Sequence, residues 1–232
     1  YTVRQGGMIM CLLKVEHVQK YYGNGGNITK ALNDISFDMK EGEFVAIMGA
    51  SGSGKTTLFN IISGIDRKYE GDCYIDDVNI QTLSEDEMTK KRRQKIGVIF
   101  QFFNLISSLT VEENVRLSRE LDGKKISEER LAEVLKELDL MNKRNCFISE
   151  LSGGQQQRVG IARVLLSGAE IILADEPTGN LDSKNTQIIL DIFKKLKEKK
   201  KTIIVITHDK HVANTADRIV YMKDGKIADE EL

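Results

Sequence analysis

Ile47-Met-Gly-Ala-Ser-Gly-Ser-Gly-Lys-Thr-Thr57 is the stretch that decides the fold of this chain. It contains Gly49-x-x-x-x-Gly54-Lys55-Thr56, a spacing typical of loops that bind phosphate groups. The apolar run 44–48 before it predicts a buried strand. After it, apolar residues recur at helical spacing and predict a helix that begins near Lys55. The residues of this apolar face are Leu58, Ile61, Ile62 and Ile65. Strand, glycine loop and helix are the context that the spacing requires.

The residue types of this loop explain the chemistry that we expect of it. Glycines allow backbone N–H groups to turn inward around an anion, and the start of the helix adds a positive dipole end. Lys55 can reach the β- and γ-phosphates of a nucleotide, and the Thr56 hydroxyl can bind Mg²⁺. An ordinary glycine-rich turn explains neither the lysine nor the hydroxyl. The predicted nucleotide-binding residues here are Gly49, Ser51, Gly52, Ser53, Gly54, Lys55, Thr56 and Thr57.

Composition limits the remaining classes of function. The chain has 232 residues, enough for a full core, with 34 Lys and Arg against 35 Asp and Glu. A net charge of −1 argues against bulk binding to nucleic acid, and we predict none. The lysine-rich run 194–201 is interpreted as a solvated helix end. No apolar run approaches the roughly 18 residues of a membrane-spanning helix.

Two further features concern the ends and the thiols of the chain. Residues 1–7 contain no methionine, and we expect them to be a leader that precedes a native start at Met8 or Met10. Cys11, Cys73 and Cys146 lie far apart without metal-binding spacing, so we expect reduced thiols. Residues 8–232 are then one domain.

Hydrophobic patterns along the chain predict an α/β fold with a mostly parallel sheet. The expected strands are 12–18, 31–39, 44–48, 71–76, 96–100, 171–175, 202–207, 218–222 and 226–228, the last two forming a hairpin around Asp224-Gly225. The expected helices cover 84–95, 110–121, 127–140, 154–166, 182–199 and 210–216. The first strands have an antiparallel pattern. Because no strand pattern interrupts 102–152, this segment is predicted to be a helical subdomain inserted into a core of 8–101 and 153–232.

A second phosphate-related motif is the run Ile171-Ile-Leu-Ala-Asp175-Glu176. Ligands of open α/β sheets lie beyond the carboxyl ends of the strands, so Asp175 is expected to face Mg²⁺ held by Thr56. Glu176 would lie near the γ-phosphate, where it can accept a proton from water.

A third motif, Leu151-Ser-Gly-Gly-Gln155, stands before a predicted helix. Ser152 suits an N-cap and the two glycines expose backbone N–H groups, which together suit a second anion site. An ordinary capped helix explains the same residues equally well.

Taken together, these motifs resemble those of the ATP-binding cassette (ABC) ATPases. The resemblance covers essentially the whole chain after its first residues, and Leu151–Gln155 is its most specific part. The runs 100–105 and 174–182 are similar to the subgroup of LolD, FtsE and MacB. The resemblance implies a RecA-like P-loop NTPase core with an N-terminal antiparallel β subdomain and an inserted helical subdomain.

The resemblance also implies roles for individual residues. Tyr22 corresponds to the aromatic residue that stacks on adenine, with Tyr21 as the less suitable candidate. Gln101 would contact Mg²⁺ and the attacking water, and His208 the γ-phosphate. The catalytic set is then Glu176, His208, Gln101 and Lys55, and the metal set is Thr56, Gln101 and Asp175. The residues that close over ATP bound to a second copy are Ser152, Gly153, Gly154 and Gln155.

The expected function is ATP hydrolysis in a membrane ABC transporter or a complex that transmits motion across the membrane. Two copies would associate head-to-tail on binding ATP and drive a separate integral permease from the cytoplasmic face of the membrane, as a peripheral subunit. The alternative is a soluble ABC ATPase of the Fe–S assembly or repair type. For the permease contact we expect at least two of five apolar residues near Gln101 to be exposed: Phe102, Phe103, Leu105, Ile106 and Leu109.

Overall fold

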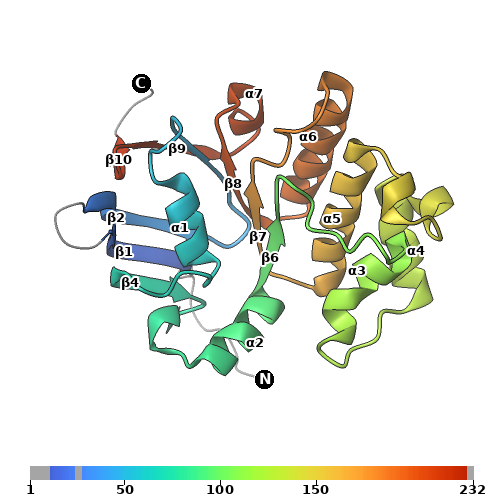
Figure 1. Cartoon of the computed structure of the whole chain (residues 1–232), viewed down its shortest axis with the longest axis horizontal. Coiled ribbons are helices and arrows are strands. Elements are labelled where there is room, and N and C mark those ends of the chain that lie inside the picture. The colour runs from blue at the N-terminus through green and yellow to red at the C-terminus, as the bar shows by residue number, and fades with distance from the viewer. Residues whose placement is uncertain (1–10, 24–27, 229–232) are drawn as a thin grey trace.

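The computed structural model describes residues 11–23 and 28–228. The expected leader at 1–7 and the two candidate start methionines lie outside these residues, as does part of the turn expected at 21–26. Two β-sheets and a group of helices make up the described chain (Figure 1). The structure confirms the predicted mixture of an antiparallel N-terminal sheet, a mostly parallel sheet and a helical insertion.

The larger sheet has six strands in the order β10-β9-β3-β8-β7-β6. Its strands are β3 (Phe44–Met48), β6 (Ile96–Ile99), β7 (Ile171–Asp175), β8 (Thr202–Thr207), β9 (Arg218–Lys223) and β10 (Lys226–Ala228). All neighbours are parallel except β9 and β10, the predicted hairpin. Strand β8 lies between β3 and β7, so the carboxyl ends of these three strands lie side by side at one edge of the sheet.

The smaller sheet is antiparallel, in the order β2-β1-β4-β5. It contains β1 (Cys11–Tyr22), β2 (Thr29–Lys40), β4 (Glu70–Ile75) and β5 (Val78–Asn79). Helix α1 (Lys55–Ile62) lies between the two sheets (Figure 1). Apolar side chains from both sheets and from α1 form one core cluster, which holds the start of α1 in a fixed place.

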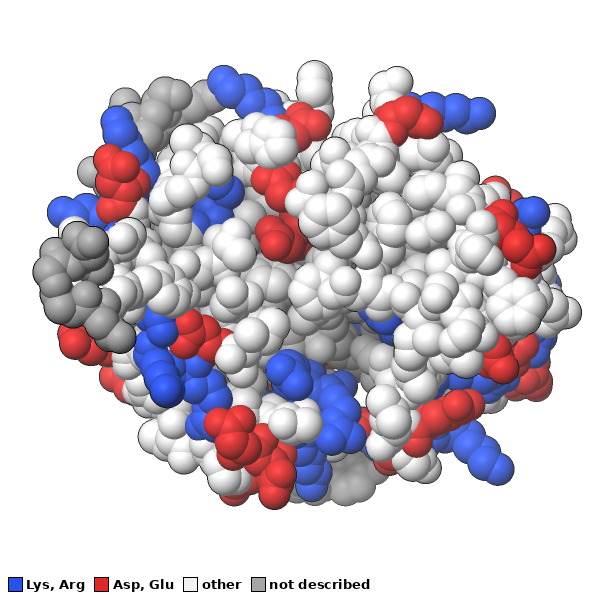
Figure 2. All heavy atoms as spheres, viewed as in Figure 1, with Lys and Arg blue, Asp and Glu red and all other residues white. Residues whose placement is uncertain are grey.

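Helices cover the opposite face of the larger sheet and form a second core cluster with it. The remaining helices are α2 (Glu85–Lys95), α3 (Val111–Glu120), α4 (Glu128–Glu137), α5 (Gly153–Ser167), α6 (Ser183–Glu198) and α7 (Lys210–Ala213). Between β6 and β7 the described chain contains α3, α4, α5 and two short 3-10 turns. On the face drawn in Figure 2, acidic and basic side chains are interspersed around the rim, and the centre is mostly uncharged.

Three of the predicted helices are shorter than expected, among them α4, which ends at Glu137 instead of Leu140. Helix α1 ends at Ile62, with Ser63 as its C-cap and Gly64 in the left-handed region at φ 70°. Ile65 therefore lies outside the helix and is 51% exposed, so its assignment to the buried face of α1 was wrong. Helix α7 ends at Ala213 instead of Ala216. None of the helices within the described residues has the length and apolar character needed to cross a membrane.

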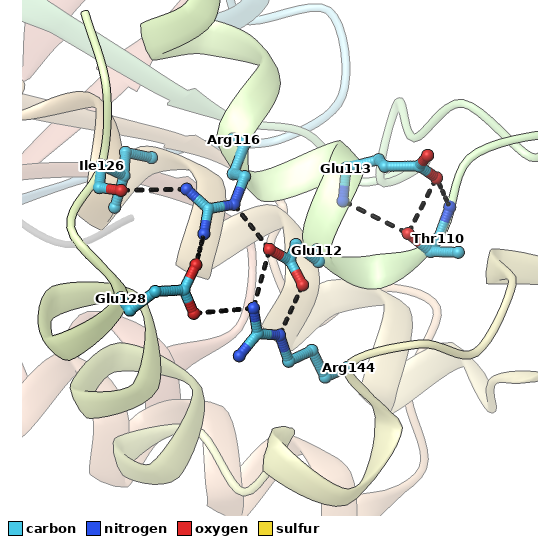
Figure 3. Close-up of polar contacts among 7 residues, drawn as sticks. All are labelled: Thr110, Glu112, Glu113, Arg116, Ile126, Glu128 and Arg144. Atoms are coloured by element: carbon cyan, nitrogen blue, oxygen red, sulfur yellow. Dashed lines mark hydrogen bonds and ion pairs between the residues drawn. The ribbon is translucent and has the colours of Figure 1, made fainter.

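A network of ion pairs joins the parts of the helical insertion (Figure 3). The Glu112 carboxylate on α3 accepts hydrogen bonds from Arg116 Nε at 2.7 Å and from Arg144 Nη2 at 2.8 Å. Both arginines also contact Glu128 on α4. The bonds from Arg144 are the main reason that the pKa of Glu112 lies below its ordinary value of 4.5. Because the Glu112 side chain is only 21% exposed, its charge is screened less than that of a surface residue.

We expect a Glu112→Gln variant to be less stable than the parent at pH 7 by about 1–2 kcal/mol, since two arginines lose a charged acceptor. A carboxyl whose folded-state pKa is lowered stabilises the fold above its unfolded-state pKa. The difference should therefore diminish below pH 4.5 and vanish below the lowered pKa. Urea unfolding over a pH series measures it, with the exposed Glu120→Gln as the matched control. A loss of stability that is the same at every pH would contradict the ionic explanation.

Candidate functional site

The glycines of the phosphate-binding loop are required by close packing. A Cβ atom at Gly49 would lie 2.2 Å from the Met222 carbonyl oxygen on β9, and one at Gly54 would lie 2.5 Å from the Ala31 carbonyl oxygen on β2. Gly54 is also the N-cap of α1, at φ 101°, and provides no side-chain cap. The N–H groups of the first turn of α1 have no intrahelical acceptor, so they remain available to an anion.

A cavity of about 680 Å³ opens beside this loop, at the carboxyl ends of β3, β7 and β8. Most of the predicted site residues line it: Tyr22, Ser51, Gly52, Gly54, Lys55, Thr56, Thr57, Gln101, Asp175, Glu176 and His208. Gly49 and Ser53 belong to the same loop but line a second cavity of about 470 Å³. The structure therefore brings together residues that are up to 186 positions apart in the chain, from Tyr22 to His208.

Lys55 is buried at the start of α1. Its ammonium group donates to the carbonyl oxygens of Gly49 at 2.7 Å and Ala50 at 2.8 Å. Burial lowers the pKa of Lys55, and the carboxylates of Glu176 and Asp175 act in the opposite direction. The charged lysine is thus held at the floor of the cavity by its own loop and faces two acidic residues.

Asp175 is the last residue of strand β7, Glu176 follows it, and both line the cavity. Burial raises the pKa of Asp175, the neighbouring Glu176 raises it further, and Lys55 opposes both. Glu176 has a left-handed backbone at φ 43°, a conformation that costs a non-glycine residue of order 1–3 kcal/mol. Its carboxylate lies 2.8 Å from His208 Nδ1 and accepts a hydrogen bond from the Thr207 hydroxyl at 3.3 Å. The strained backbone therefore presents this carboxylate to the end of β8.

Gln101 reaches the same cavity from the end of β6. The Asn180 side-chain amide donates to the Gln101 backbone oxygen at 3.1 Å, and Gln101 Nε2 lies 3.5 Å from Asn180 Oδ1. A Cβ at Gly179 would lie 3.0 Å from Gln101 Nε2. Asn180, which follows β7, was not among the predicted site residues although its sequence run was noted.

The motif Leu151–Gln155 lies outside the cavity, at the start of α5. Ser152 caps this helix by accepting from Gln155 N at 3.4 Å, and the Gln155 side chain accepts from Ser152 N at 2.9 Å. Ser152 and Gly153 are exposed, whereas Gly154 is buried with its Cβ position only 2.0 Å from Asn185 Oδ1. The structure thus separates the two anion-binding motifs of one chain.

Tyr22 lies at the end of β1 and borders the cavity with a half-exposed ring. Its hydroxyl donates to Asp66 Oδ2 at 3.1 Å, and the Lys20 ammonium lies 4.9 Å from the ring centre.

The sequence analysis missed four lining residues, which belong to no motif: Thr29, Lys30, Ala31 and Ile206. Pairing of β1 with β2 brings the first three beside Tyr22, and no local pattern announces this.

The apolar residues that follow Gln101 are partly exposed, as expected. Phe102 is 75% exposed and Ile106 is 42% exposed, while the other three are half-buried. The prediction of at least two exposed residues is confirmed.

A family model described as ABC transporter matches residues 32–179, more than half of the chain. The chain belongs to the ABC transporter family. This ABC cassette is 48% identical over 227 residues to the uncharacterized ABC transporter ATP-binding protein MJ0796 of Methanocaldococcus jannaschii, with 95% of this chain and 97% of that protein covered. It is 47% identical over 223 residues to the macrolide export ATP-binding/permease protein MacB of Mannheimia succiniciproducens. That match covers 95% of this chain and 35% of MacB, so the cassette spans about a third of that relative.

Solved structures give the same assignment for the cassette. A dimeric structure of a post-hydrolysis state of MJ0796, bound to ADP and Pi, has a TM-score of 0.85 at 48% identity and covers 94% of this chain and 97% of that one. The structure of cbiO1 from Clostridium perfringens, part of the ABC transporter complex cbiONQ, has a TM-score of 0.82 at 31% identity. The match covers 94% of this chain and 87% of that one. The predicted resemblance to ABC ATPases of the MacB-containing subgroup and the predicted fold class are confirmed.

We expect an Asp175→Asn variant of the cassette to be more stable than the parent at pH 7 to 8 without nucleotide or metal, because the folded state disfavours the charged carboxyl. A carboxyl with a raised folded-state pKa destabilises the fold above that pKa, and the effect disappears below the unfolded-state value of 3.8. The stability gain should therefore vanish in strong acid. Urea unfolding in EDTA measures it, with the exposed Asp139→Asn as control. A variant that is less stable at neutral pH would contradict this.

Proposed function

We propose that this chain is the ATP-hydrolysing subunit of a membrane ABC system. The observation that carries the proposal is the convergence of Lys55, Gln101, Asp175 and the Glu176–His208 pair on one cavity, while Ser152 caps a helix elsewhere on the surface. One copy thus holds the parts of a phosphoryl-transfer site together with a separate anion-binding helix end.

We place ATP in the cavity with its phosphates at the loop and its base at Tyr22. The loop N–H groups and Lys55 suit the phosphates, and the Tyr22 ring at the far end of β1 suits the base. Stacking of a base on an aromatic ring contributes about 1–3 kcal/mol and tolerates different bases. The volume of about 680 Å³ lies within the range of small-molecule sites.

The donor atoms at the cavity fit Mg²⁺. The Thr56 hydroxyl, the Gln101 carboxamide and the Asp175 carboxylate offer hard oxygen atoms, and Mg²⁺ is commonly held by one or two carboxylates together with phosphate oxygens. Within residues 11–23 and 28–228 there is no group of three or more His, Cys, Asp or Glu that would favour a different metal. When bound, Mg²⁺ neutralises charge that develops on the phosphate oxygens.

Hydrolysis then depends on positioning and on one proton transfer. Glu176 accepts the proton of the attacking water, and its hydrogen bonds with Thr207 and His208 hold the carboxylate at the cavity edge. Lys55 and His208 stabilise negative charge on the γ-phosphate as water attacks it and the bond to ADP breaks.

The exposed start of the motif Leu151–Gln155 supports a head-to-tail pair of cassettes. Ser152 and Gly153 face solvent and lie outside the cavity of their own chain, so in this arrangement each would close over nucleotide bound to Lys55 of a second copy. Structures of MJ0796, at 48% identity, are described as dimeric, which supports association of two copies.

The membrane partner is supported by a relative and by an exposed surface. MacB carries ATP-binding and permease in its name, and the cassette corresponds to about a third of it. Phe102 and Ile106 give the helical insertion an exposed apolar surface near Gln101. We assign the cassette to the cytoplasmic face of the membrane, where ATP is present. A soluble ABC ATPase of the Fe–S assembly or repair type is the alternative that the tests below address.

We expect a Glu176→Gln variant to bind ATP with Mg²⁺ and to dimerise, because the loop and Lys55 are intact while the proton acceptor is lost. Size-exclusion chromatography with light scattering measures the mass with ATP and with ADP. Adding Gly153→Asp to this variant should abolish the dimer. The fold should tolerate the aspartate, because a Cβ at this position meets only ordinary contacts, the nearest at 3.7 Å. Its carboxylate, however, would face and repel the phosphates bound to the second copy. ATP binding by the double variant should persist. A Glu176→Gln variant that stays monomeric at saturating ATP would overturn the head-to-tail assembly.

We also expect an Ile106→Ser variant to lose association with membranes that contain the permease, while its ATPase activity in isolation stays within about twofold of the parent. Flotation of the cassette with membranes from the source cells measures this. Val78→Ser is the matched control, because Val78 is 38% exposed on β5, in the other sheet. A parent cassette that never floats with membranes would favour the soluble alternative.

A further inference from the structure

Arg163 on α5 contacts the chain segment that follows Gln101. Its guanidinium donates from Nη1 to the Asn104 carbonyl oxygen at 2.7 Å and from Nη2 to the Phe103 carbonyl oxygen at 3.4 Å. The two donors of one planar group therefore hold two successive carbonyl groups. A lysine in the same place has a single nitrogen and cannot reproduce this fork.

The segment held by Arg163 is a strained turn, Phe102–Asn104. Phe103 has φ 58° and Asn104 has φ 47°, so two successive residues lie in the left-handed region. Asparagine tolerates this conformation, but a bulky residue such as phenylalanine rarely adopts it. Such a turn persists only when its surroundings hold it in place.

Helix α5 is shaped to receive this turn. Gly153 and Gly160 lie on the face of α5 that meets the turn: a Cβ at Gly153 would be 3.7 Å from Phe103 Cζ, and one at Gly160 would be 3.8 Å from the Phe103 oxygen. Arg163 lies three residues beyond Gly160 and continues the same face. Packing and hydrogen bonding thus act together on the backbone next to Gln101.

We propose that Arg163 is a positioning residue for ATP hydrolysis, which acts by fixing the turn Phe102–Asn104 and through it the place of Gln101 in the nucleotide cavity. The inference rests on the proposed function, because Gln101 matters only if the cavity turns over ATP. Asn180 also contacts Gln101: its side-chain amide donates to the Gln101 backbone oxygen at 3.1 Å, and its Oδ1 lies 3.5 Å from Gln101 Nε2. The Gln101 backbone is thus held by Asn180 and by the turn that Arg163 fixes, and this backbone decides where the carboxamide lies.

The first test separates turnover from binding. In Arg163→Gln, kcat for ATP hydrolysis should fall by about tenfold to hundredfold, the size expected when a reacting geometry is misplaced by about 1 Å. The Kd for ATP, measured with a fluorescent ATP analogue, should stay within about twofold, because Lys55 and the loop are untouched. Arg119→Gln is the matched control: Arg119 is a second half-buried arginine, on α3, and its Nη1 lies 3.7 Å from the Cβ position of Gly168, the C-cap of α5. This control should leave both constants near those of the parent.

The second test asks whether Arg163 acts through Gln101. In a Gln101→Ala background, Arg163→Gln should change kcat by less than about twofold, because the group that it positions is gone. Arg163→Lys keeps the charge and one donor, and kcat should lie between those of the parent and Arg163→Gln. If Arg163→Gln fails to fold, Arg163→Lys in the two backgrounds gives the same comparison.

Three results would overturn the proposal. The first is an Arg163→Gln variant with the kcat of the parent, and the second is a parallel loss of ATP affinity and kcat. The third is a full additional loss in the Gln101→Ala background, which is the additive behaviour of a merely structural residue. Absence of ATP turnover in the parent cassette is a different result, since it would overturn the proposed function itself.

Discussion

The close approach of three backbone segments at the phosphate-binding loop is the constraint on which the rest of the structure depends. Side chains are impossible at Gly49 and Gly54, because Met222 of β9 and Ala31 of β2 come within 2.2 and 2.5 Å of where a Cβ would stand. The loop that joins β3 to α1 is therefore packed against both β2 of the antiparallel sheet and β9 near the C-terminus. The curvature of the loop, and hence the direction of its N–H groups, is set by packing in both sheets.

The same packing explains the electrostatics of the cavity. Parallel strands β3, β7 and β8 end at one edge, so Lys55, Asp175 and Glu176 meet in a partly buried place. Burial opposes the charged forms of Lys55 and Asp175, which the shifts of their pKa values record. The fold thus keeps these charges in an unfavourable place, and the proposed nucleotide with its divalent cation would relieve them.

Helix α5 connects the two ends of the proposed mechanism. Its N-terminus carries the exposed Ser152 and Gly153, and its middle carries Arg163, which holds the turn after Gln101. The turn after Gln101 and the motif Leu151–Gln155 therefore both contact or belong to one helix. Asn180 adds a further link. It lies in the segment that follows β7, the strand that leads to the two carboxylates, and it donates to the Gln101 backbone oxygen. In the proposed assembly, these contacts would link the nucleotide cavity of one copy to the helix end that it offers to another.

The sequence by itself determined the elements, since apolar periodicity, capping residues such as Ser152 and the glycine loop are all local signals. It also determined the fold class and, through five short motifs, the family. What only the tertiary structure decided is which residues meet: Thr29 and Lys30 border the cavity through strand pairing, and Arg163 reaches the turn after Gln101 across 59 positions. Helix α1 also stops before Ile65 because Gly64 takes a left-handed conformation, which periodicity does not reveal. Such contacts depend on the backbone path between distant segments, and no local pattern in the chain encodes that path.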